Sequence, residues 1–154
     1  EVFVFIFFGP VAVCGTYYVQ AGFIGASAWW ASIPMGFLVS AILVVNNLRD
    51  LETDKKGGKR TLAVRLGPAG TRWEYSFFLT AALTVPLIMW LSGGHSAWIL
   101  LPWISLFLIP PLVRDLQTKK GVPLNNTLAG TARLSLVFGV LFSIGYLLDK
   151  MKYF

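Results

Sequence analysis

The segment LVVNNLRDLETDKKGGKRTLAVRLG, residues 43–67, joins the end of an apolar run to a strongly polar one. Its first letters continue a stretch rich in Val, Leu and Ile, and the rest gathers amides, carboxylates, Lys and Arg. The whole chain is 56% hydrophobic and only 13% charged, with a mean hydropathy of +0.68. A water-soluble domain carries about 25% charged residues. The composition therefore indicates a membrane protein, and this segment is one of the few places where the chain meets water.

The charge balance and the single cysteine narrow the class further. A net charge of +6 in 154 residues is compatible with nucleic-acid binding. It is more typical of a membrane protein whose basic loops face the cytoplasm and anionic lipid. Cys14 has no partner for an internal disulfide. The length suits one compact unit over residues 1–154.

Five stretches are apolar enough to cross a membrane, or nearly so, since a spanning helix needs about 20 residues. They are residues 2–20, 28–48, 75–92, 97–114 and 129–148, and prolines interrupt the fourth. The predicted fold class is therefore an all-α, polytopic transmembrane bundle. Because Glu1 leads directly into an apolar run without an initiator methionine, we expect the chain to be part of a longer protein.

The connections between these stretches differ in charge. Residues 20–27 and 92–97 contain no Lys, Arg, Asp or Glu, whereas residues 49–73 and 114–128 are basic. The positive-inside rule predicts that both basic connections are cytoplasmic and both neutral ones external. The N-terminal end is then cytoplasmic and the C-terminus external, although Lys150 and Lys152 run against this bias.

Asn46, Asp50 and Asp54 are spaced four residues apart. Residues at this spacing lie about 40° apart around a helix, so a helix that continued past the membrane surface would place all three on one face, with Asn47 beside them. Such oxygens suit Mg²⁺, which is commonly held by one or two carboxylates together with substrate phosphates. The segment predicts a metal site at the mouth of the bundle.

The cations that follow fit an anionic ligand of that metal. Gly57 and Gly58 are expected to end the helix, so that Lys59, Arg60 and Arg65 fold back toward a phosphate or diphosphate. The alternative is that these charges only solvate the helix end and set the topology. That alternative explains the Lys and Arg but not the regular spacing of the oxygen ligands, and polar groups near membrane depth indicate function.

Three stretches resemble one family. NNLRDLETDKKGGKRTLAVRLG resembles the second aspartate-rich motif of the UbiA superfamily of membrane prenyltransferases, in the form found in the 1,4-dihydroxy-2-naphthoate branch of menaquinone biosynthesis. FFGPVAVCGTYYVQ (7–20) and LNNTLAGTARLSLVFG (124–139) are similar to the same branch. The resemblance covers nearly the whole chain.

The resemblance implies a bundle of about nine helices with a cavity open to lipid, in which two Asp-rich motifs hold Mg²⁺ and a prenyl diphosphate. This chain would be the C-terminal part, with the second motif in a loop over about residues 46–73. The first motif has no match in it. We therefore expect the N-terminal half of the same enzyme as a partner, in a bacterial plasma membrane.

The implied reaction transfers a polyprenyl group to an aromatic acceptor, 1,4-dihydroxy-2-naphthoate, with loss of its carboxylate as CO₂. Mg²⁺ and cations would stabilise the departing diphosphate. The metal ligands would be Asp50 and Asp54, and these two residues together with Lys59 would be the catalytic residues. The residues expected to contact diphosphate are Asn46, Asn47, Lys59, Arg60 and Arg65, with Lys59 and Arg60 favoured by their closeness to the glycine turn.

Tyr17, Tyr18 and Arg133 are weaker candidates for lining the substrate cavity. For the two tyrosines the alternative is an aromatic belt at the external interface, where Trp29 and Trp30 are also expected.

Four other polar residues are interpreted structurally. We expect Arg49 to pair with Glu52 or with lipid headgroups, Asn125 and Asn126 to cap the last helix, and His95 to be solvated.

Other functions remain open at this stage. A homogentisate, 4-hydroxybenzoate or chlorophyllide type of acceptor is one alternative. A non-enzymatic transporter or assembly subunit is another, although transporter sites lie near the bilayer midplane on broken helices. A CDP-alcohol phosphotransferase would need more aspartates than the chain contains.

Overall fold

The computed structural model describes residues 1–151, and all of their regular structure is helical. Five helices are long and apolar enough to span a membrane. They cover Val2–Ala21, Ala26–Arg49, Leu62–Leu91, Ala97–Thr118 and Leu124–Met151. The predicted all-α transmembrane bundle is thus confirmed, with the spans in the predicted order.

Several of these spans are composite. The first consists of α1 (Val2–Ile6), the π-helical η1 (Phe7–Val11) and α2 (Ala12–Ala21), and the fourth of the 3₁₀-helical η2 (Ala97–Leu108) and α6 (Ile109–Thr118). Pro10 lies in η1 and Pro102 in η2. Because proline cannot donate a backbone hydrogen bond and clashes with the preceding turn, it accounts for the departure from α-helical geometry in both. The remaining helices are α3 (Ala26–Arg49), α4 (Leu51–Lys56), α5 (Leu62–Leu91) and α7 (Leu124–Met151).

Two predicted boundaries are wrong. The long helix of the third span begins at Pro68 rather than at residue 75, and the helical turn of residues 62–66 is set off from it by a kink at Gly67, whose φ of 68° and ψ of 177° are not helical. Only glycine adopts this backbone conformation readily. The last span begins at Leu124 rather than at residue 129. Both basic connections are therefore shorter than predicted.

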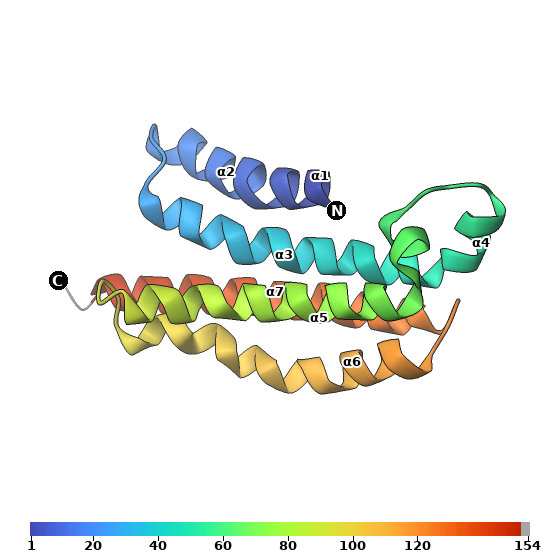
Figure 1. Ribbon diagram of the computed structural model, residues 1–154. Helices are drawn as coiled ribbons and strands as arrows, with labels where there is room; N and C mark the ends of the chain where they lie inside the picture. The colour runs from blue at the N-terminus through green and yellow to red at the C-terminus, as the bar shows by residue number, and fades with distance from the viewer. Residues whose placement is uncertain (152–154) are drawn as a thin grey trace.

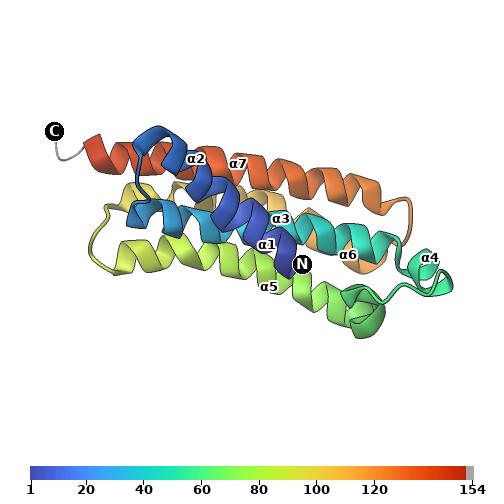
Figure 2. The ribbon, with the colours of Figure 1, turned by 90° about the horizontal axis from the view of Figure 1, so that it is seen from above.

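The helix α3 lies at the centre of the fold. It packs against α5, α7 and the composite first span, and η2 packs against both α7 and α5. Figure 1 shows the spans as nearly antiparallel rods, and Figure 2 shows α1 and α2 crossing the outside of α3. Both basic connections, α3–α5 and α6–α7, leave one end of the bundle, and the neutral connections leave the other (Figure 1).

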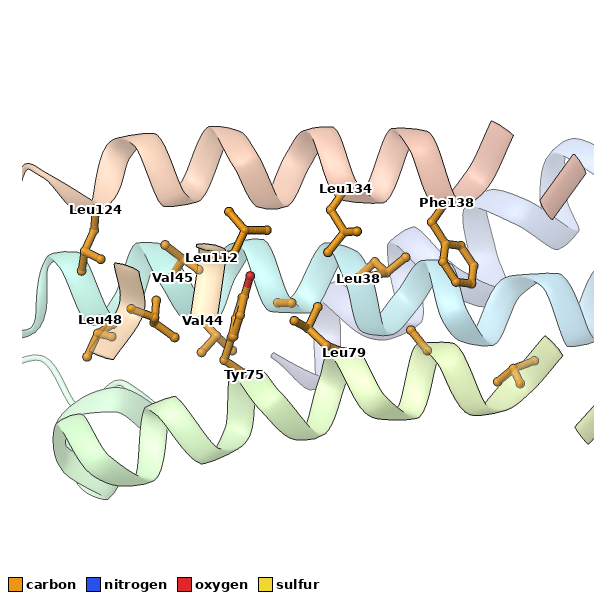
Figure 3. Close-up of a cluster of buried hydrophobic side chains, with 14 of the residues drawn as sticks. Leu38, Val44, Val45, Leu48, Tyr75, Leu79, Leu112, Leu124, Leu134 and Phe138 are labelled. Carbon is orange, nitrogen blue, oxygen red and sulfur yellow. The ribbon is translucent and has the colours of Figure 1, made fainter. Parts of the chain in front are cut away.

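The core is formed by apolar side chains between α3, α5, α6 and α7 (Figure 3). Tyr75 is fully buried among them, and its hydroxyl lies 2.9 Å from the Thr131 hydroxyl, which itself donates to the Thr127 carbonyl. Hydrogen bonds between helices hold membrane bundles together where apolar contact alone gives little advantage over lipid. Large apolar side chains on the outside are exposed, among them Phe3, Val19, Trp73 and Phe107.

Glycines allow the closest helix contacts. A Cβ added to Gly145 of α7 would lie within steric overlap of the Trp98 carbonyl oxygen of η2, and one added to Gly9 would lie 2.8 Å from the Ser32 carbonyl oxygen of α3. Small residues let membrane helices approach this closely.

We expect Gly145→Ala to destabilise the bundle, because the new methyl group must push η2 away from α7. Overpacking of this kind costs about 1–3 kcal/mol. The matched control is Gly15→Ala, since a Cβ at Gly15 has no neighbouring atom within 4 Å. Thermal unfolding in detergent should show a lower midpoint for Gly145→Ala only. Equal midpoints for the two variants would contradict the close contact.

Candidate functional site

The polar segment crosses the end of the bundle in three steps. Helix α3 ends at Arg49, Asp50 leaves the helical conformation (φ −93°, ψ 5°), and the short α4 resumes at Leu51. Gly58 then turns the chain back with φ 71°. Buried Leu48 and Leu51 attach both sides of the break to the core. The single continuous helix expected through Asp54 is therefore interrupted at Asp50.

Asp54 and Lys59 form one of two ion pairs in this segment, and Asp54 is the more buried of the two carboxylates. The Lys59 ammonium lies 2.8 Å from an Asp54 carboxylate oxygen, and the Asp54 side chain is only 9% exposed. The glycine turn brings Lys59 back, as predicted, and its backbone N–H also donates to the Asp54 carbonyl. The hydrogen bond to Asp54 raises the pKa of Lys59, and the nearby charge of Asp50 acts in the same direction.

Asp50 pairs with its own neighbour in the chain. Two nitrogens of the Arg49 guanidinium lie 2.8 and 2.6 Å from the two Asp50 carboxylate oxygens, and a third lies 2.9 Å from the amide oxygen of Asn125 on α7. These hydrogen bonds lower the pKa of Asp50, and the charge of Lys59 lowers it further. The expectation that Arg49 pairs with Glu52 or lipid is wrong, because the break after α3 turns Asp50 toward it.

Asn125 and Asn126 do not flank the last helix as caps. The helix α7 already begins at Leu124, so both lie in its first turn, and Asn125 is instead an acceptor for Arg49. No local pattern predicts this contact, because it joins residues 76 positions apart.

The four oxygen-bearing residues of the motif do not converge on one point. The amide of Asn47 donates to the Glu1 carboxylate at 2.8 Å, on the side of the first span. The backbone N–H of Asp50 still donates to the Asn46 carbonyl, and that of Asp54 to the Asp50 carbonyl. The spacing of one helical turn therefore survives in the backbone, while the side chains of Asn47, Asp50 and Asp54 have separate partners.

The remaining candidates lie apart from this group. Arg60 and Arg65 are exposed on the turn and on the first residues of α5, and Arg133 is exposed on α7. Tyr17 lines a cavity of about 650 Å³ between α2, α3 and α7, far along α3 from Asp50, and Tyr18 is 55% exposed. The structure thus places Lys59 against Asp54 and within reach of the charge of Asp50, leaves Arg60 and Arg65 exposed on and after the turn, and places Arg133 and the two tyrosines elsewhere in the bundle.

A second polar group lies at the opposite end of the bundle. His95 Nδ1 is 2.7 Å from a carboxylate oxygen of Asp149, and the Ser96 backbone N–H donates to the other oxygen at 2.5 Å. The Asp149 side chain is fully buried and the His95 side chain is 16% exposed. The expectation that His95 is solvated is wrong, since it joins the loop before η2 to the end of α7.

The sequence pattern of the UbiA prenyltransferase family matches residues 1–127. The chain belongs to the UbiA prenyltransferase family. It is 34% identical to the 1,4-dihydroxy-2-naphthoate octaprenyltransferase of Bacillus subtilis over 99% of its length, and 30% identical to that of Escherichia coli over 97%. It is 48% identical to that of Mycobacterium leprae over 61%.

This UbiA family chain spans about half the length of the relatives it matches, 49% for both the Bacillus and the Escherichia proteins. Among residues 1–151, no three His, Cys, Asp or Glu side chains lie close enough together to hold a metal ion. The donor set of Asp50 and Asp54 still fits Mg²⁺, which is commonly bound through one or two carboxylates with waters and phosphates completing its shell.

The Arg49 pair makes a prediction about Asp50. Replacing Arg49 with Gln removes the hydrogen bonds that hold the pKa of Asp50 below its ordinary value, so this pKa should rise toward that value. The measurement is a carbon NMR titration of the Asp50 carboxyl in detergent. Lys56→Gln, an exposed cation on α4, is the control and should leave it unchanged. An unchanged titration midpoint of the Asp50 carboxyl in Arg49→Gln would contradict the Arg49–Asp50 pairing.

The Asp149 group makes a prediction about stability. Asp149→Ala leaves the Ser96 N–H and the His95 ring without their buried partner, and breaking such a buried pair costs about 3–5 kcal/mol. We expect a clearly lower unfolding midpoint in detergent. Ser143→Ala, an exposed position on α7, should change it little. A loss no larger than that of the control would show that the contact contributes nothing.

Proposed function

We propose that this chain is the part of a membrane prenyltransferase that binds the diphosphate of a polyprenyl diphosphate. The observation that carries the proposal is the grouping of Asp50, Asp54 and Lys59 at the end of the bundle, within the segment matched by the family. Two carboxylates next to cations, placed where apolar helices reach water, suit a ligand with a charged diphosphate and an apolar tail.

The acceptor proposed is an aromatic ring, as the names of the relatives suggest. These relatives are 1,4-dihydroxy-2-naphthoate octaprenyltransferases, so the reaction proposed is prenyl transfer to that naphthoate in menaquinone biosynthesis, with loss of the ring carboxylate as CO₂. An acceptor of another aromatic class is the alternative. Because the relatives are about twice as long, we propose that a preceding membrane segment of the same enzyme supplies the first Asp-rich motif.

The chemistry needs the diphosphate to leave from an allylic carbon. Asp50 and Asp54 would hold Mg²⁺, which when bound neutralises the negative charge that develops on the leaving group. Lys59 would donate hydrogen bonds to the diphosphate when the metal replaces it at Asp54. Arg60 and Arg65 are exposed beside the turn and are available for the outer phosphate. Asn46 and Asn47 would orient phosphate oxygens or metal-bound waters.

The location of the reaction follows from the charges. Both basic connections leave the end of the bundle that carries Asp50. By the positive-inside rule we place this end in the cytoplasm, and by the bacterial relatives we place the protein in a bacterial plasma membrane. A diphosphate made in the cytoplasm then reaches the site without crossing the bilayer.

The test is prenyl transfer by membranes that carry the complete protein containing this chain. With a polyprenyl diphosphate, dihydroxynaphthoate and Mg²⁺, we expect Asp50→Asn and Asp54→Asn each to lower turnover by about 100-fold or more, since each removes charge that holds the metal at the leaving group. Chelation of Mg²⁺ should abolish turnover.

The control is Asp115→Asn, which removes a carboxylate from the other connection, where Asp115 pairs with Lys119. It should retain turnover. Unchanged turnover in both motif variants would overturn the metal site. Activity with a different aromatic acceptor, and none with dihydroxynaphthoate, would support the proposed prenyl transfer but contradict the proposed naphthoate acceptor.

A further inference from the structure

A pocket of about 480 Å³ opens at the same end of the bundle, behind Asp50. Its walls come from the α3–α4 junction, from the start of α5 at Pro68 and Arg72, and from residues 119–122 together with Asn125. None of the residues assigned above to the diphosphate lines this pocket, and of the two proposed metal ligands only Asp50 does. It is therefore a separate hollow that shares one wall with the proposed metal site.

Cations from three distant parts of the chain line this pocket. They are Arg49, Arg72, Lys119 and Lys120, and only two carboxylates, those of Asp50 and Glu52, stand among them. Setting the topology requires basic residues at this end, but it does not require them to converge. Their convergence on one hollow is the observation that calls for a ligand.

Two of the four cations are already neutralised. Arg49 pairs with Asp50, and Lys119 lies 2.7 Å from a carboxylate oxygen of Asp115. Arg72 donates its Nε to the Leu116 carbonyl at 2.9 Å, which fixes the side chain, and neither Arg72 nor Lys120 has a carboxylate partner in residues 1–151. Within the part of the chain that the structure describes, the pocket therefore holds two cations without an ion-pair partner, one of them positioned by a backbone contact, against a single unpaired carboxylate, that of Glu52.

The rest of the lining is apolar. Leu48, Leu51, Pro68 and Val122 line it, and Val122 is 75% exposed. The transmembrane helices α3, α5, α6 and α7 end or begin around the pocket, so it lies at the boundary between the bilayer and water. Basic pockets between membrane helices at the cytoplasmic face suit the headgroups of anionic lipids.

We propose that this pocket binds a phosphate group through Arg72 and Lys120. The phosphate can belong to the headgroup of an anionic phospholipid or be free inorganic phosphate or diphosphate, and both present the same oxygens to the cations. A bound phosphate would join the α6–α7 connection to the start of α5 beside the proposed metal site. This inference does not depend on prenyl transfer, because it concerns binding at a different set of residues.

The test measures binding to the complete protein containing this chain, held in nanodiscs. One arm compares phosphatidylglycerol with phosphatidylcholine as the surrounding lipid, by native mass spectrometry of retained lipid. The other arm titrates inorganic phosphate and diphosphate in phosphatidylcholine alone, without Mg²⁺ and in the protein with Asp54→Asn, a residue outside the pocket, so that binding at the metal site does not contribute.

The decisive variant is Arg72→Gln with Lys120→Gln, and it should weaken saturable binding by at least about tenfold, as expected for two cations at a charged surface. The matched control is Lys56→Gln with Arg114→Gln, which removes the same charge from exposed positions outside the pocket and should bind normally. Because Arg72 also contacts the Leu116 carbonyl, Lys120→Glu alone is a second variant, at an exposed side chain.

Each outcome decides the proposal. Retention of phosphatidylglycerol alone identifies a lipid headgroup, and saturable binding of phosphate or diphosphate identifies the free anion. Equal loss in the pocket and control variants would show diffuse attraction to a basic surface and would overturn the site. The absence of saturable binding for every probe would also overturn the site. Normal binding in both the Lys120→Glu variant and the double variant would do the same.

Discussion

A membrane chain places most of its charges where its helices end, and this constraint organises much of this protein. Inside the bilayer each backbone polar group must be satisfied within the helix, and an unpaired charge is costly. Several of its few carboxylates therefore lie at the two ends of the bundle, although Glu74 lies within α5. Asp50 and Asp54 lie at one end with cations beside them, and Asp149 lies at the other, buried with His95 and the Ser96 N–H.

The two ends use their carboxylates differently. Asp149 accepts from two neighbours that no substrate could replace, and it holds the last helix to the loop before η2. Asp50 and Asp54 instead pair with Arg49 and Lys59, whose cationic groups are of the kind that binds phosphate. The Asp50 and Lys59 side chains are partly exposed, at 36% and 69%. Because the Asp50 carboxylate and the Lys59 ammonium reach water, a metal ion and a phosphate can replace these pairings at lower cost than in a fully buried pair.

Much of the fold could be predicted from the sequence because lipid imposes a simple rule on composition. The five spans appear as long apolar runs, and the sharp change in charge after residue 48 marks where one of them ends. The start of the third span could not be predicted, since it depends on the kink at Gly67, where the backbone leaves the helical conformation between two helical segments. The sequence alone does not say at which glycine such a kink forms.

The contacts of the polar segment were predicted in part, for a related reason. The spacing of Asp50, Asp54 and the glycine turn is local, and local spacing placed Lys59 back against Asp54. In contrast, Arg49 and Asn125 contact each other although they are 76 residues apart in the sequence, and His95 and Asp149 do so although they are 54 residues apart. Such contacts depend on how helices pack, which the apolar pattern of a membrane chain specifies poorly because nearly every face is apolar. The pocket lined by Arg72 and Lys120 likewise depends on helix packing. These two cations are far apart in the sequence, and they line one pocket only because α5 and the α6–α7 connection meet beside α3.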